Sequence, residues 1–142
     1  MAEALFRAEL ARLGLEGRVS VSSFGLAAES GVPASENARK AAAELGADLS
    51  EHRSRRAADV SLSAADVFVG MTAGHAHALK TLPARVFGIG EFFPEGAFPR
   101  EVPDPFGGSL AEYRAARDAI VSAFPRLIDF LEKTFDGKEK AR

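Results

Sequence analysis

The chain has 142 residues, of which 46% are hydrophobic and 27% charged, and this composition predicts one globular domain with a single core. The formal net charge is -2, and the 18 lysines and arginines are spread along the sequence, so a nucleic-acid partner is not expected. With no cysteine, the sequence excludes disulfides, thiolate metal sites and a thiol nucleophile within this chain.

Membrane and metal partners are also not expected. No stretch approaches the roughly 20 apolar residues that cross a bilayer. The start lacks the charged-then-apolar layout of a signal peptide, so we expect a cytoplasmic protein with no membrane partner. The three histidines are His52, His75 and His77, and the last two would point to different faces of a helix. We predict neither a metal site nor a cofactor.

Two helices and a strand are predicted in the first third of the chain. A helix over residues 1–13 is indicated by apolar side chains three and four positions apart: Leu5, Phe6, Leu10 and Leu13. Gly14 follows where a left-handed cap would sit. Val19 and Val21 alternate with polar residues, which predicts a short strand running into a turn at Phe24-Gly25. A second helix is predicted over residues 34–45, closed by Gly46, before a polar surface connection from Asp48 to Asp59.

The middle of the chain predicts a strand, a helix and a strand. The compact apolar run from Val67 to Met71 is typical of a buried parallel strand. Thr72 can cap a helix that continues to about Leu82, and residues 85–89 form the next strand candidate.

The last third predicts a long loop and a long closing helix. Residues 90–108 hold four of the seven prolines and four of the thirteen glycines, which rules out regular structure. Ser109 and Glu112 have the spacing of a capping box, and Pro125 interrupts the helix that follows. We expect a charged, mobile tail over residues 136–142.

The alternation of strands and helices predicts a three-layer α/β domain, with a parallel sheet and helices on both faces. Ligands in such folds bind at the carboxyl ends of strands, where a strand turns into a helix. In the printed sequence no strand or glycine-rich turn stands before the first helix. The expected sheet therefore lacks an N-terminal central strand.

Short motifs in one order resemble those of a known family: Met1-Ala2-Glu3-Ala4, Val21-Ser22-Ser23, Gly31-x-Pro33, Leu49-Ser50-x-His52-Arg53-Ser54-Arg55, Ala65-Asp66, Met71-Thr72-x-x-His75 and Asp104-Pro105-Phe106-Gly107-Gly108-Ser109. Each motif is weak alone. Together they resemble the low-molecular-weight protein phosphatases, small tyrosine and arginine phosphatases that also include one class of arsenate reductases. The likeness runs from Met1 to about Phe135 and predicts one domain over residues 1–135. In that family a phosphate loop, Cys-x-Gly-Asn-x-Cys-Arg-Ser-Pro, directly precedes the segment that matches Met1-Ala2-Glu3-Ala4.

The resemblance implies a role for three residues. Asp104 would protonate the leaving group after a thiolate attacks phosphorus, and would then take a proton from the hydrolytic water; its alternative is an ordinary turn residue. Phe106 would form an aromatic wall beside the leaving group, with core packing as its alternative. Ser23 matches a serine that holds the loop asparagine. We interpret His52, Arg53 and Arg55 as a solvated basic connection rather than a substrate contact.

Two hypotheses follow from an acid without its nucleophile. In the first, the protein is a phosphatase whose recorded start is too late, and the chain as written does not hydrolyse phosphoesters. In the second, it is a noncatalytic phosphatase-like binding or regulatory module. Arsenate reduction is disfavoured because it relays through several thiols. Phosphotyrosine, phosphoarginine and small phosphoester substrates all stay open, as does the oligomeric state.

Overall fold

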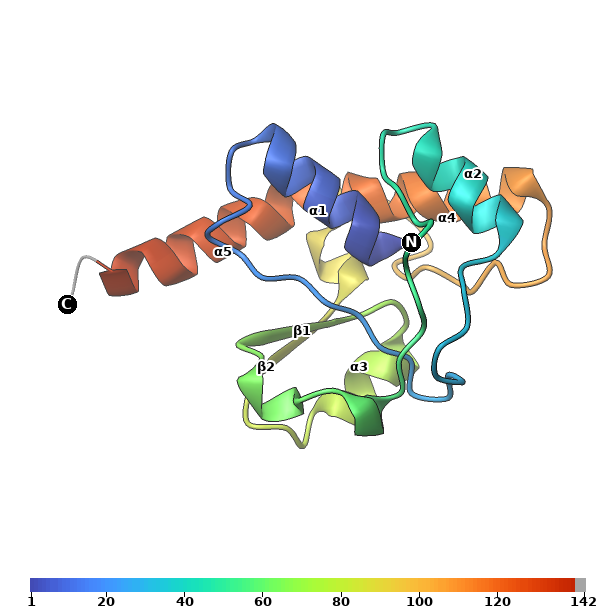
Figure 1. Ribbon diagram of the computed structural model, residues 1–142. Coiled ribbons are helices and arrows are strands. Elements are labelled where there is room, and N and C mark those ends of the chain that lie inside the picture. Colours follow the sequence, from blue (N-terminus) through green and yellow to red (C-terminus); the bar gives the residue numbers. More distant parts are fainter. Residues whose placement is uncertain (140–142) are drawn as a thin grey trace.

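The computed structural model describes residues 1–139. Its helices are α1 (Ala2–Arg12), α2 (Glu36–Ala43), α3 (Ala73–Leu79), α4 (Leu110–Ser122) and α5 (Phe124–Glu139); its strands are β1 (Val67–Gly70) and β2 (Arg85–Gly88); and its short 3-10 helices are η1 (Ala57–Asp59), η2 (Leu62–Ala64) and η3 (Ile89–Phe92). Figure 1 shows α1, α2, α4 and α5 gathered on one side of the two strands.

The two strands form a parallel pair, with Val67 opposite Arg85 and Gly70 opposite Gly88. Helix α3 connects them and packs closely, because a Cβ on Gly70 would stand 2.7 Å from the Ala76 nitrogen. A parallel sheet with helices is what the alternation of elements predicted, and this prediction is confirmed.

The opposite face of the sheet meets the main core. The ring of Phe87 on β2 lies with its centroid 5.0 Å from that of Phe130 on α5 and 5.4 Å from that of Phe92 on η3. Further in, Phe6 of α1 contacts Phe124 at the start of α5, with 5.0 Å between centroids. Three layers result: α3, the strands, and the helices that share this core.

The predicted strand at Val19 and Val21 is wrong for this chain. The backbone there is extended, but within the described residues β1 pairs only with β2, and residues 19–23 belong to no strand ladder. A strand needs a neighbour to share its amides and carbonyls. The Val21 carbonyl instead accepts a hydrogen bond from the Arg7 guanidinium, at 2.7 Å. The alternation was informative about burial, since both valine side chains pack partly buried against the core.

Local signals at the helix ends are confirmed. Gly14 and Gly46 have positive φ, at 71° and 77°, and follow α1 and α2 as left-handed caps do. Ser109 and Glu112 form the capping box at α4: the Ser109 amide lies 2.6 Å from Glu112 Oε2, and the Glu112 amide lies 3.2 Å from Ser109 Oγ. The Thr72 hydroxyl caps α3, which ends at Leu79, earlier than predicted.

The last two helices meet near Pro125. The break before Pro125 separates α4 from α5 at Ala123. Helix α5 then continues to Glu139, so residues 136–139 of the predicted tail are helical. An ion pair between Arg18 and Asp136 lies on this last part of α5. Residues 140–142 lie outside the described residues. Within residues 1–139 no helix has both the length and the apolar character that a bilayer span requires.

Candidate functional site

The loop before α4 is fastened to the carboxyl end of β1. Val102 is buried, and its amide donates a hydrogen bond to the carbonyl of Met71, at 2.8 Å. Next to it the Glu101 carboxylate accepts from the Ala73 amide at 3.0 Å. The loop is therefore held at the edge of a parallel sheet where α/β proteins bind their ligands.

Asp104 follows this anchor by two residues and is exposed. Its Oδ1 accepts a hydrogen bond from the Phe106 amide at 3.0 Å, which closes a turn of the kind that aspartate favours. Because Oδ1 is engaged within the turn, the carboxyl group has a fixed orientation. Pro103 and Pro105 stiffen the chain on either side.

Phe106 lies in the same turn and is 84% exposed, which excludes core packing for its ring. The turn is also tied to α2, because Asn37 Nδ2 donates to the Gly108 carbonyl at 3.2 Å. Gly107 has a φ of 77°, a conformation that glycine adopts without strain. Asp104 and Phe106 thus stand together on a braced turn.

Ser23, which by resemblance matches a serine that holds a loop asparagine absent from this sequence, contacts Glu3 instead. Its hydroxyl donates to Glu3 Oε2 at 2.5 Å, so it supports the first turn of α1. Glu3 is only 7% exposed and also pairs with Arg7, at 2.7 Å. Glu3 was not predicted as a site residue from the sequence. A glutamate in the first turn of a helix is usually exposed and interacts with the helix dipole, so its burial has no local signal.

The residues predicted to form a basic connection make two kinds of contact, with Glu3 and with nearby backbone carbonyls. His52 Nδ1 and an Arg55 guanidinium nitrogen lie 3.9 Å and 3.8 Å from Glu3 Oε2, whereas Arg53 donates to the carbonyls of Ser50 and His52. Burial lowers the pKa of His52, and the positive charge of the chain's amino group adds to this, with Glu3 opposing it. We call Glu3, Arg7, Ser23, His52 and Arg55 the Glu3 cluster.

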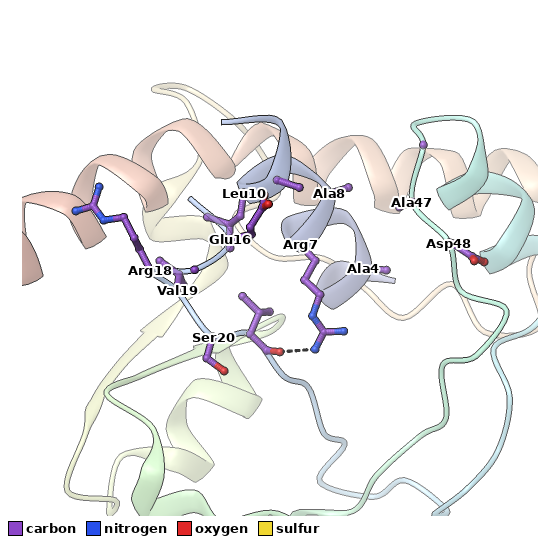
Figure 2. A pocket seen from close by; sticks show the side chains of 14 residues that line it. Ala4, Arg7, Ala8, Leu10, Glu16, Arg18, Val19, Ser20, Ala47 and Asp48 are labelled. Carbon is purple, nitrogen blue, oxygen red and sulfur yellow. Dashed lines mark hydrogen bonds between the residues drawn. The ribbon is translucent and has the colours of Figure 1, made fainter. Parts of the chain in front are cut away.

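A cavity of about 710 Å³ lies between α1, residues 16–21 and residues 46–48 (Figure 2). Alanines line the α1 side, and Arg7 reaches across to the Val21 carbonyl, as the dashed line in Figure 2 marks. Asp104, Phe106 and Ser23 are not among its lining residues. The cavity runs alongside residues 19–21, which belong to the segment predicted to be a strand.

The chemistry that these residues offer is proton transfer without a nucleophile. Asp104 can donate and accept a proton, but the sequence contains no thiol to attack phosphorus. Within residues 1–139 no three histidine, aspartate or glutamate side chains gather as metal ligands would.

The chain is similar to known proteins over most of its length. A family model described as "Low molecular weight phosphotyrosine protein phosphatase" matches residues 1–138. A curated relative from Geobacillus stearothermophilus, named Protein-arginine-phosphatase, is 30% identical over 118 residues, which cover 80% of this chain and 78% of that protein.

Solved structures agree with the family match. A low molecular weight protein tyrosine phosphatase from T. tengcongensis superposes with a TM-score of 0.77 and 28% identity, covering 90% of this chain and 87% of that chain. A protein tyrosine phosphatase from Entamoeba histolytica reaches a TM-score of 0.83 at 22% identity, covering 94% and 88%, and at that identity the likeness shows the fold.

Proposed function

The chain belongs to the low molecular weight phosphotyrosine protein phosphatase family, and from that premise we propose that it serves the hydrolysis of phosphorylated protein side chains, with Asp104 as proton donor. The thiolate and the phosphate loop would come from residues that the printed sequence does not contain. The observation that carries the proposal is the braced Asp104 turn, anchored through Val102 at the carboxyl end of β1.

The proposed reaction has two steps. A cysteine thiolate attacks phosphorus as the bond to the leaving oxygen or nitrogen breaks, and the Asp104 carboxyl gives its proton to that atom. A water then attacks the phosphocysteine and loses a proton to the Asp104 carboxylate, which frees phosphate and the thiolate. Backbone amides and an arginine of the loop would stabilise the charge on phosphorus in both steps.

Phosphoarginine is the substrate that we favour over phosphotyrosine. Support comes from the relative named Protein-arginine-phosphatase and from Phe106, because by resemblance phenylalanine is common at this position in arginine-directed and other bacterial members. A phosphoarginine peptide and a phosphotyrosine peptide, compared by kcat/KM, would test this preference.

The acid role is testable by completing the site. A strand followed by Cys-x-Gly-Asn-x-Cys-Arg-Ser-Pro, joined ahead of Met1, should give a protein that hydrolyses an aryl phosphate. Asp104→Asn in that protein should lower kcat about 100-fold or more. Asp129→Asn is the matched control, because Asp129 is an exposed aspartate on α5 paired with Lys133, and it should leave kcat unchanged.

The printed chain by itself should stay at the background rate, because it has no thiol. Turnover by the printed chain that disappears in Asp104→Ala would show that another nucleophile acts. Turnover by the completed protein that survives Asp104→Asn would remove Asp104 from the mechanism.

A noncatalytic binding module is the second candidate, and the extended segment at residues 19–23 favours it. This segment belongs to no strand ladder, and a segment outside a ladder can pair with an added strand. A cooperative thermal transition by a monomer of residues 1–142 would support a self-sufficient module. A molten, oligomerising species would contradict it.

A further inference from the structure

A cavity separate from the Asp104 turn lies at the carboxyl ends of both strands. Its volume is about 290 Å³, and it is an open hollow bordered by α3, η3 and the chain at Arg100. Val86 and Gly88 of β2 lie on one side, and Met71 and Thr72 lie where β1 passes into α3. Parallel sheets offer their ligand sites at this end of the strands.

Three cationic or protonatable side chains line this cavity from two separate segments. His77 lies in the last turn of α3, Lys80 is the C-cap residue directly after that helix, and Arg100 approaches from the loop. The guanidinium of Arg100 donates to the Gly90 carbonyl, which fixes the side chain while using only part of its set of N–H donors.

Glu91 is the one carboxylate among the lining residues, and its Oε2 already accepts the Gly88 amide at 2.8 Å. Among the lining residues, the two cationic side chains of Lys80 and Arg100 therefore outnumber the one carboxylate, while the Glu101 carboxylate beside the cavity is held by the Ala73 amide. Such a charge balance attracts an anion, and a guanidinium pairs readily with a tetrahedral oxyanion.

The size of the cavity limits the ligand. About 290 Å³ stands at the lower end of the range for small-molecule sites. That space suits a phosphate group or a short phosphomonoester, and it is small for a nucleotide.

We propose that His77, Lys80 and Arg100 form a binding site for a small phosphate-type anion, distinct from the reaction site at Asp104. The site does not depend on the proposed phosphatase reaction, because no step of that reaction uses these three residues. The anion can be free phosphate or a phosphate carried on a peptide, since both present the same tetrahedral oxyanion.

The three histidines of the chain provide an internal test by NMR. Inorganic phosphate is added to the 142-residue protein at constant pH and ionic strength, and the ring signals of His52, His75 and His77 are followed. The His77 signal should shift and saturate, while the signals of His52 and His75, which do not line the cavity, should stay in place. A second titration uses a peptide that carries one phosphoserine. The lower of the two Kd values shows whether free phosphate or peptide-borne phosphate binds more tightly.

Two variants and two controls complete the test. Lys80→Ala and Arg100→Ala should each weaken phosphate binding about tenfold or more, as expected for a lost charge-assisted hydrogen bond. Lys133→Ala and Arg114→Ala remove a lysine and an arginine that pair elsewhere, with Asp129 and Glu44, and should not change the Kd. If one of the two variants fails to fold, the Kd of the other variant and the shift of the His77 signal still decide the test.

Equal shifts of all three histidines, or no shift of His77, would overturn the proposal. So would a Kd that is the same in Lys80→Ala, Arg100→Ala and the wild-type protein. These results would leave the Asp104 proposal untouched, because that proposal is judged by turnover in the completed protein.

Discussion

The Ser23 hydroxyl donates a hydrogen bond to the buried Glu3 carboxylate, with 2.5 Å between Oγ and Oε2. The same carboxylate pairs with Arg7 at 2.7 Å and has His52 and Arg55 within 4 Å. One acidic side chain thus connects the first turn of α1 to the extended segment and to the connection after α2. We expect these contacts of Glu3 to contribute more to the free energy of unfolding than an ordinary ion pair on an exposed helix face does.

Glu3→Gln should lower the free energy of unfolding by about 1–3 kcal/mol, because it replaces a buried, charged acceptor with a neutral amide that cannot pair with Arg7 and Arg55. Urea denaturation measures this, provided that the m-value is unchanged. Glu36→Gln is the control: Glu36 also lies in a first turn with an i,i+4 cation, Lys40, but its side chain is 73% exposed. Equal urea midpoints for the two variants would contradict a special role for the Glu3 cluster.

His52 should make stability depend on pH. Burial holds the pKa of its ring below the ordinary value of 6.5, so around that pH the unfolded chain binds more protons than the folded one. Stability is therefore fully present above pH 6.5 and is lost as the pH falls through 6.5 toward the folded-state pKa. Urea midpoints between pH 5 and pH 8 should show a weaker slope in His52→Gln. His75→Gln replaces an exposed ring and should keep the wild-type slope.

Gly90→Ala should displace the chain that leads to Asp104. A Cβ at Gly90 would stand 1.8 Å from the carbonyl oxygen of Arg100, a backbone atom that cannot swing aside. We expect a loss of about 1–3 kcal/mol in the free energy of unfolding, typical of overpacking. Gly17→Ala, where nothing lies within 4 Å of the added carbon, is the control. A thermal midpoint unchanged in Gly90→Ala would show that the loop is free to move.

Ser109→Ala should lower the free energy of unfolding by about 1 kcal/mol, the usual effect of removing an N-cap side chain. The hydroxyl accepts the Glu112 amide at the start of α4, directly after the Asp104 turn. Ser109→Thr keeps the oxygen and should restore most of the loss. Ser63→Ala, at an exposed serine outside the helices α1–α5, should have no measurable effect. A Thr variant as unstable as the Ala variant would argue against capping as the cause.

Features set by neighbouring residues could be predicted from the sequence. Gly14, Gly46 and the Ser109 capping box end or start helices through their own backbone and side chains, so short motifs were sufficient. The apolar run from Val67 to Gly70 was equally readable, because a buried parallel strand is apolar on both faces.

Features set by distant residues could not be predicted in the same way. Val19 and Val21 alternate as a strand does, but a strand requires a partner, which the alternation does not reveal. The contact between Glu3 and His52 joins positions 49 residues apart, and no local pattern connects them. The Asp104 turn was predicted by resemblance. The exposure of Phe106 and the hydrogen bond from Asn37 to Gly108 depend on how distant segments pack, which no local motif shows.

The ion pair between Arg18 and Asp136 spans 118 positions of the sequence. It joins the segment that follows α1 to the later turns of α5. Shortening the chain from its carboxyl terminus past Asp136 would loosen the extended segment beside Val19, far from the cut in sequence. A tag or fusion partner is therefore better tolerated beyond Glu139 than in place of the turns before it.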